Sequence, residues 1–138
     1  MKKKFFIITI ILCLHSCKED STKYYDAGII KANAKDYKNA IIDFTKVIEI
    51  TPNSAPAYFN RAVLLVEIQD YKNAILDYNK TAELDSQYHQ VYLLRGYAKQ
   101  KSGDQEGACM DFGLAKVFGD QLAEEYMKTY CNNYKPIF

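Results

Sequence analysis

Apolar and polar positions follow the same order twice along this chain, at a fixed interval. The stretch DYKNAIIDF at residues 36–44 returns as DYKNAILDY at residues 70–78, an offset of 34 residues. A helix that is written twice at this distance indicates an internal repeat, and a repeat decides the fold before any other feature does.

Three blocks of 34 residues align without gaps, and we call them the first, second and third repeats. They cover residues 21–54, 55–88 and 89–122. Small residues fill the eighth and twentieth positions of each block: Gly28, Ala62 and Gly96, then Ala40, Ala74 and Ala108. Aromatic residues fill the fourth and twenty-fourth: Tyr24, Tyr58 and Tyr92, then Phe44, Tyr78 and Phe112. This pattern predicts two antiparallel helices that approach closely at the small residues, with aromatic rings around the contact.

The sixteenth position predicts where the second helix of each block begins. It holds Asp36, Asp70 and Asp104, and aspartate is a good N-cap because its carboxylate accepts a backbone N–H of the first turn. After the third repeat, Leu122, Tyr126 and Tyr130 recur at helical spacing. We therefore predict three helix-turn-helix units and a capping helix over about residues 120–131, seven helices in all.

This pattern resembles the tetratricopeptide repeat. The resemblance implies an all-α fold, a right-handed superhelical solenoid over residues 22–134, in which stacked helix pairs bury one another's apolar faces. The sequence departs from the family pattern where Ser86 and Asp120 replace the usual proline, and in three further ways. The seventh position has arginine instead of an aliphatic residue, the eleventh has lysine instead of an aromatic one, and two turns lack glycine. The residues concerned are Arg61 and Arg95, Lys31 and Lys99, and Lys35 and Gln69.

The beginning of the chain has a different character. Residues 1–16 combine three lysines with an apolar run from Phe5 to Leu14, which is too short to span a bilayer and is typical of a secretory signal. Residues 14–17 read LHSC and resemble a bacterial lipobox. The resemblance implies cleavage before Cys17 and lipidation of that cysteine, with residues 17–21 as a tether. An ordinary signal peptide, or an uncleaved anchor, is the alternative.

Lipidation would place the protein in the bacterial cell envelope, anchored to a membrane by its N-terminal lipid. The residues after Cys17 are Lys18, Glu19 and Asp20. They resemble an export signal that sends some lipoproteins to the outer face of the outer membrane, and a solvated tether is the alternative. We expect the outer membrane, at its periplasmic or its surface face.

The resemblance also implies a binding groove lined by the first helices of the pairs. Its positions fall on Tyr25, Ile29, Phe59, Asn60, Val63, Gln90, Leu93 and Tyr97. This apolar, aromatic surface favours an extended apolar peptide or an amphipathic helix as partner. The alternative is that some of these side chains pack inside the superhelix.

One class of tetratricopeptide-repeat protein binds C-terminal carboxylates through lysine, asparagine and arginine. Its positions correspond here to Tyr25, Ile29, Asn60, Gln90 and Leu94, of which only Asn60 matches. Because the cationic donors are missing, we do not expect this chain to bind such tails.

No catalytic or cofactor pattern emerges from the sequence. His89 is the one histidine outside the signal segment, and there is neither a phosphate-binding glycine loop nor a zinc-type cluster. The formal net charge of +1 gives no case for nucleic acid. Cys109 and Cys131 come close if the last two helices are antiparallel, and we weigh a disulfide against two buried thiols.

These features leave three functions to compare. We predict a non-enzymatic scaffold or adaptor that binds protein and needs no cofactor or metal. The alternative is a dedicated accessory subunit of an outer-membrane assembly machine, and an enzyme would need a titratable cluster that the sequence lacks. A second copy that docks on an exposed terminal helix stays open as a further partner.

Overall fold

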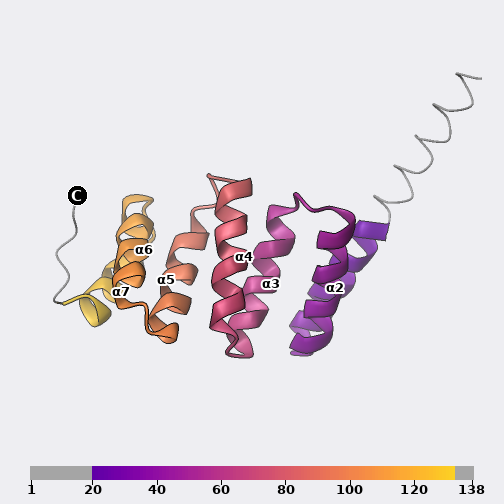
Figure 1. Ribbon diagram of the computed structural model, residues 1–138, viewed down its shortest axis with the longest axis horizontal. Coiled ribbons are helices and arrows are strands. Elements are labelled where there is room, and N and C mark those ends of the chain that lie inside the picture. Colours follow the sequence, from indigo (N-terminus) through magenta and orange to yellow (C-terminus); the bar gives the residue numbers. More distant parts are fainter. Residues whose placement is uncertain (1–19, 133–138) are drawn as a thin grey trace, which may run out of the picture.

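The computed structural model describes residues 20–132, and within them every regular element is an α-helix (Figure 1). The first helix covers residues 20–33. The helices that follow are α2 (Tyr37–Ile50), α3 (Ala55–Glu67), α4 (Tyr71–Leu84), α5 (Gln90–Ser102), α6 (Gln105–Val117) and α7 (Ala123–Tyr130). The predicted signal segment at residues 1–16 and the predicted lipidation site Cys17 lie outside the described residues.

The helices stand in one row, each antiparallel to the next (Figure 1). The first helix pairs with α2, α3 with α4, and α5 with α6, so each predicted repeat contains one helix pair. The predicted all-α solenoid of seven helices is confirmed for residues 20–132. The last helix begins later than predicted, at Ala123, because Gly119 adopts a φ of 83° and the Asp120 carboxylate accepts the Leu122 N–H.

The core lies where small residues face aromatic ones across each pair. Phe44, Tyr78 and Phe112 are no more than 1% exposed. In the third repeat, the Phe112 ring packs directly on Gly96, where an added Cβ would lie 2.7 Å from a ring carbon. The repeated alternation of small and aromatic positions therefore sets the distance between the helices of a pair.

The turns inside the repeats all have one residue with a left-handed backbone. Lys35 has a φ of 60°, Gln69 of 64° and Gly103 of 92°. A residue with a side chain is strained in this region, and glycine is not. Two of the three turns therefore keep a conformation that their residue disfavours.

The aspartate after each of these turns behaves as predicted in two repeats. The Asp70 and Asp104 carboxylates accept the backbone N–H groups of Asn73 and Gly107, at 3.3 and 2.9 Å. In the first repeat the prediction was wrong, because the carboxylate of Asp36 accepts both its bonds from the Asn39 side-chain amide instead.

Candidate functional site

A pocket of about 390 Å³ opens between α3, α5 and α7. It brings together three of the predicted groove residues, Val63 of α3 and Leu93 and Tyr97 of α5. Its apolar and aromatic lining also includes Val66, Leu94, Tyr126 and, from α4, Tyr71 and Tyr78. A concave apolar surface with a few hydroxyl groups is suited to binding the side chains of a partner.

Leu93 contributes less to this surface than the sequence suggested. Its side chain is only 8% exposed and belongs to the core cluster around Phe112 and Ala108. It forms the floor of the pocket, whereas Val63 and Tyr97 are half-buried and line its sides. For Leu93 the alternative interpretation, packing inside the superhelix, describes most of the side chain.

Tyr25, Ile29 and Asn60 lie outside the pocket and join the first helix to its neighbours. The Asn60 amide donates a hydrogen bond of 2.7 Å to the Tyr25 hydroxyl, and the Tyr25 ring meets Phe44 edge-on at 5.5 Å. Ile29 packs against the core cluster of the first repeat. These side chains hold repeats together and present only part of their surface to a partner.

The two remaining groove residues lie at the other end of α3 and α5. The Phe59 ring is half-buried between Tyr78 and Tyr88, with ring centres 5.9 and 4.7 Å away. Gln90 begins α5 and is exposed. Six of the eight predicted groove residues are therefore half-buried, Leu93 is buried and Gln90 is exposed, and a pocket is formed at Val63, Leu93 and Tyr97.

Tyr126 is a site residue that the sequence analysis did not assign to the groove. It comes from α7, where its ring meets Tyr97 at 6.3 Å and Phe112 at 5.3 Å. Burial is the main reason that the pKa of Tyr126 is raised, with Tyr130 and Tyr97 adding to it, so the hydroxyl stays neutral. Its helical spacing from Leu122 and Tyr130 was the available signal, because it places Tyr126 on the apolar face of the capping helix.

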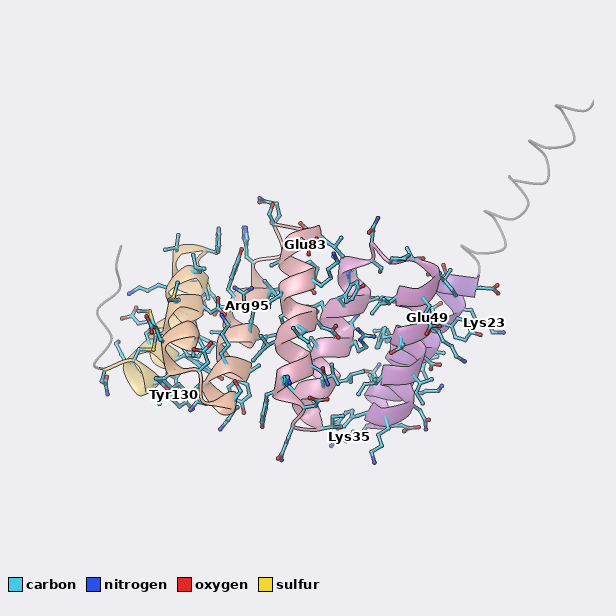
Figure 2. The ribbon with its side chains drawn as sticks, viewed as in Figure 1. Lys23, Lys35, Glu49, Glu83, Arg95 and Tyr130 are labelled. Atoms are coloured by element: carbon cyan, nitrogen blue, oxygen red, sulfur yellow. A yellow bond between two sulfur atoms is a disulfide. The ribbon has the colours of Figure 1, made fainter. Side chains whose placement is uncertain are left out.

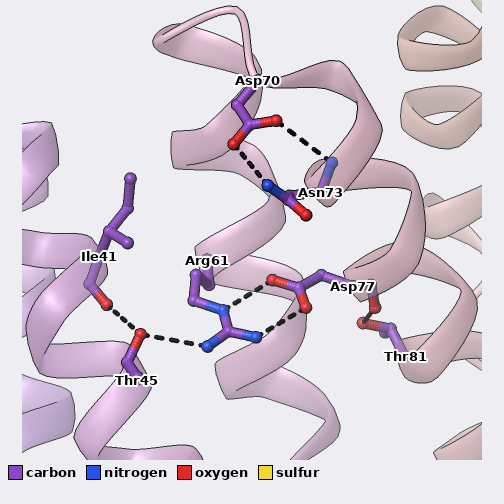
Figure 3. A network of polar contacts seen from close by, with 7 residues as sticks. All are labelled: Ile41, Thr45, Arg61, Asp70, Asn73, Asp77 and Thr81. Atoms are coloured by element: carbon purple, nitrogen blue, oxygen red, sulfur yellow. Dashed lines mark hydrogen bonds and ion pairs between the residues drawn. The ribbon is translucent and has the colours of Figure 1, made fainter.

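The arginines at the seventh position of the repeat have partners that the sequence analysis missed. In the second repeat, the Arg61 guanidinium donates to both oxygens of the Asp77 carboxylate, at 2.7 and 2.8 Å (Figure 3). Its third nitrogen donates to the Thr45 hydroxyl on α2, at 3.1 Å. One arginine therefore joins α2, α3 and α4, across the boundary between two repeats.

The third repeat copies this arrangement. Arg95 donates to both oxygens of Asp111, at 2.8 and 2.6 Å, and to the Asn79 side-chain oxygen of the second repeat, at 2.9 Å. Lys99, at the eleventh position, adds an ion pair of 2.9 Å to Asp111. The departures from the family pattern are thus compensated inside the same repeat, sixteen residues after the arginine.

These ion pairs shift the pKa of both arginines in the same direction. For Arg61, the hydrogen bond that it donates to Asp77 is the largest effect and raises its pKa despite burial. For Arg95, burial opposes the charge most strongly, but the hydrogen bond and the attraction of Asp111 together outweigh it, and the pKa is again raised. Both guanidinium groups are structural charges that stay ionised.

The predicted cysteine pair lies beside this end of the solenoid. Cys109 of α6 and Cys131, directly after α7, form a disulfide in the structure, with Cα atoms 5.7 Å apart. The side-chain amide of Gln105 also donates to the Tyr130 carbonyl. Both connections hold α7, and with it Tyr126, against α6.

No metal centre and no membrane-spanning element was found in the described part of the chain. Residues 20–132 contain no group of three or more His, Cys, Asp or Glu side chains placed to hold a metal ion. None of the helices in this range is both long enough and apolar enough to cross a bilayer.

Comparison with known families and structures agrees with this geometry. Models of the tetratricopeptide repeat match residues 24–54 and 44–75. No curated protein matches the chain. Among solved structures, the TPR domain of Arabidopsis OM64 is similar, with a TM-score of 0.76 and 24% identity over 82% of this chain and 98% of that one.

Two further similar structures are complexes with peptides. The second TPR domain of human RPAP3, in complex with an HSP70 peptide, has a TM-score of 0.79 and 24% identity, over 85% of this chain and 99% of that one. The TPR2B domain of yeast Sti1, in a complex with pHsp70, has a TM-score of 0.72 and 24% identity, over 82% and 94%. At this level of identity the likeness concerns the fold alone.

Proposed function

This chain is a tetratricopeptide-repeat protein, and from that premise we propose that it is a non-enzymatic scaffold that binds a peptide or helix of another protein. The observation that carries the proposal is the apolar pocket between α3, α5 and α7, lined by Val63, Val66, Leu94, Tyr97 and Tyr126. Tyrosine rings are frequent anchors in binding sites, because they offer a large apolar area together with a polar tip.

The chemistry of the pocket favours apolar side chains of the partner. Its volume of about 390 Å³ accepts one or two large side chains, as an amphipathic helix presents at positions i and i+4. Glu67 is the one charged residue of its lining and is exposed. We therefore propose that a leucine- or phenylalanine-containing segment inserts here, with a basic residue placed to meet Glu67.

The acidic peptides bound by some of the similar solved structures are poor candidates. The human RPAP3 domain is in complex with the HSP70 peptide SGPTIEEVD. At the five clamp positions, this chain has no lysine or arginine, and its one matching residue, Asn60, donates its amide to Tyr25. A carboxylate placed there would lack cationic donors and would lose its hydration without compensation.

We also propose that the scaffold is anchored in the bacterial envelope through lipidated Cys17. The support is the basic and apolar segment before this cysteine and its LHSC sequence. An anchored scaffold would hold its partner at a membrane, in our proposal the outer membrane. A dedicated accessory subunit of an outer-membrane assembly machine differs from this adaptor in having one dominant, stoichiometric partner.

The test uses a photo-crosslinking amino acid placed in intact cells at Val66, which lines the pocket. The matched control carries it at Leu76, which is 58% exposed on α4 outside this pocket. We expect adducts at position 66 that are absent at position 76. A single dominant adduct would favour the accessory subunit, and several would favour the adaptor.

Measuring the affinity of the captured segment for purified variants then shows whether the pocket binds it specifically or only lies near it. Tyr97→Ala should weaken binding about tenfold, as loss of an aromatic anchor does, whereas Leu76→Ala should not. Thermal unfolding checks that both variants stay folded. Equal adducts at both positions, or full affinity in folded Tyr97→Ala, would show that the pocket is not the binding site.

A further inference from the structure

One edge of the solenoid contains the loops that connect consecutive repeats and the loop that connects the third repeat to the capping helix. Because the helices alternate in direction, the loops at residues 51–54, 85–89 and 118–122 lie together along the upper edge in Figure 1. The first described residue, Asp20, starts the first helix at this same edge. The turns inside the repeats, including the one at Lys35, lie along the opposite edge (Figure 2).

The last of these loops, together with Val117 at the end of α6, presents exposed apolar side chains, unlike the other two. Val117 is 77% exposed, Leu122 54% and Phe118 41%. The residues that correspond to Val117 in the first two repeats are Glu49 and Glu83. The repeat pattern therefore places a charge at this position, and only the third repeat replaces it with an apolar side chain.

The Phe118 ring is held in place. It stacks on His89, with ring centres 4.0 Å apart and planes within 9°, and on Tyr92 at 5.2 Å. Beside the loop, Lys116 faces Glu124 at 3.9 Å, and within the loop the Asp120 carboxylate accepts the Leu122 backbone N–H. The result is a fixed apolar projection, formed by Val117, Phe118 and Leu122, at one end of the edge.

The proposed anchor lies near the other end of the same edge. Cys17 precedes Asp20 by three residues, which span at most about 10 Å when fully extended. A lipid on Cys17 therefore keeps the start of the first helix, which lies at this edge, close to the membrane surface. Figure 1 shows the start of the first helix and the α6–α7 loop toward opposite ends of the long axis.

We propose that the α6–α7 loop is a second membrane contact, with Val117, Phe118 and Leu122 inserted into the headgroup region of the bilayer. This inference rests on the proposed lipidation of Cys17. Apolar side chains gain stability at the boundary between headgroups and acyl chains, and two separated contacts fix the orientation that one anchor leaves free. The solenoid then lies with its long axis along the membrane.

The test uses the mature lipidated chain in vesicles of phosphatidylethanolamine and phosphatidylglycerol that contain a lipid with a spin-labelled headgroup. A fluorophore is attached at Gln121→Cys in the loop or at Ser102→Cys on the opposite edge, both exposed positions. We expect strong quenching at position 121 and little at position 102. Equal quenching at the two positions would overturn the inference.

A pair of double variants separates apolar insertion from mere proximity. Val117→Ser with Leu122→Ser should abolish the quenching at position 121. The control, Ile42→Ser with Leu76→Ser, removes two apolar side chains that are 53% and 58% exposed on α2 and α4 and should leave the quenching unchanged. Quenching that survives the first pair would overturn the inference. Mass spectrometry that finds no lipid on Cys17 would overturn both the anchoring and this inference, whereas the peptide pocket is tested independently.

Discussion

The first and third repeats have the same buried aspartate but neutralise it differently. In the first, Asp43 pairs with Lys31 alone, at 2.5 Å, and that lysine side chain is 39% exposed. In the third, Asp111 is held by Arg95 and Lys99, whose side chains are 14% and 18% exposed. The N-terminal repeat thus uses one hydrated cation, whereas the C-terminal repeat buries two.

The N-terminal end of the solenoid is also more exposed to solvent than the C-terminal end. Ile30 of the first helix is 68% exposed, whereas its counterparts Leu64 and Ala98 are buried at 4% and 0% against a preceding repeat. The other end is covered by α7 and connected by the Cys109–Cys131 disulfide. We therefore expect the N-terminal repeat to be less stable than the third repeat, although both follow the same pattern. The pocket lies at the C-terminal end, which α7 and the disulfide hold in place.

Removing the aspartate should separate the two repeats most clearly. Asp111→Ala leaves two buried cations without a partner and should cost about 3–5 kcal/mol of unfolding free energy. Asp43→Ala should cost about 1 kcal/mol, because Lys31 can turn to water. Urea unfolding of both variants checks this, with Asp111→Asn as a control of similar shape. Equal losses would contradict the comparison.

Breaking the disulfide should lower the free energy of unfolding by less than Asp111→Ala does. The bridge closes a loop with a sequence separation of 22 residues, for which chain entropy predicts about 3 kcal/mol. Cys109→Ala with Cys131→Ala should therefore lower stability and make unfolding insensitive to reductant. Unfolding of the native protein that does not change with reductant would show that the two thiols are not bridged.

Replacing the glycine at the eighth position by alanine should affect the first and third repeats differently, because the glycines are packed with different tightness. In Gly96→Ala the new Cβ would lie 2.7 Å from Phe112, and overpacking of about 1–3 kcal/mol should exceed the gain in helix propensity of about 1 kcal/mol. In Gly28→Ala the nearest atom of Phe44 is at 3.0 Å, and we expect little net change.

Thermal unfolding of the two glycine variants checks this difference. Ala62 already occupies the position in the second repeat, fully buried, so Ala62→Gly is the reciprocal control and should be destabilising. A loss in Gly28→Ala as large as that in Gly96→Ala would mean that the two contacts are equally tight.

The turns should give the smallest effects. Lys35→Gly and Gln69→Gly relieve a left-handed backbone and should each stabilise the protein by up to about 1 kcal/mol. Gly103→Gln should destabilise it by a similar amount. Ala34→Gly, next to Lys35 but without a positive φ, is the control and should be destabilising. Its stabilisation would show that the gain does not come from the turn.

The repeats and their helices could be predicted from the sequence because each depends on residues at one fixed spacing. The ion pairs could not, although Asp43, Asp77 and Asp111 share the twenty-third position. A family pattern describes each position by itself, and at the seventh position alone Arg61 and Arg95 are departures from it. Each arginine is explained only together with the aspartate sixteen residues later. Side chains at that separation meet only when the chain turns back into an antiparallel second helix.

The candidate site was predictable in outline and less so in detail. Val63 and Tyr97 were found because the groove positions recur with the repeat. Leu93 lines the pocket but is more buried than its counterparts Tyr25 and Phe59, because equivalent positions need not have equivalent neighbours and Leu93 packs in the cluster that contains Phe112. Tyr126 comes from a helix outside the three blocks, so no repeat position pointed to it.

The arginine ion pairs have a consequence for how such an array grows. Residues 55–88 contain both Arg61 and its partner Asp77, so a duplicated copy of this segment would bring its own counter-ion. The contact to the preceding unit is also provided for, because Arg95 already meets Asn79 where Arg61 meets Thr45. The middle repeat thus contains both charges of its ion pair, and a gene duplication that lengthens the protein by this repeat leaves neither charge without a partner.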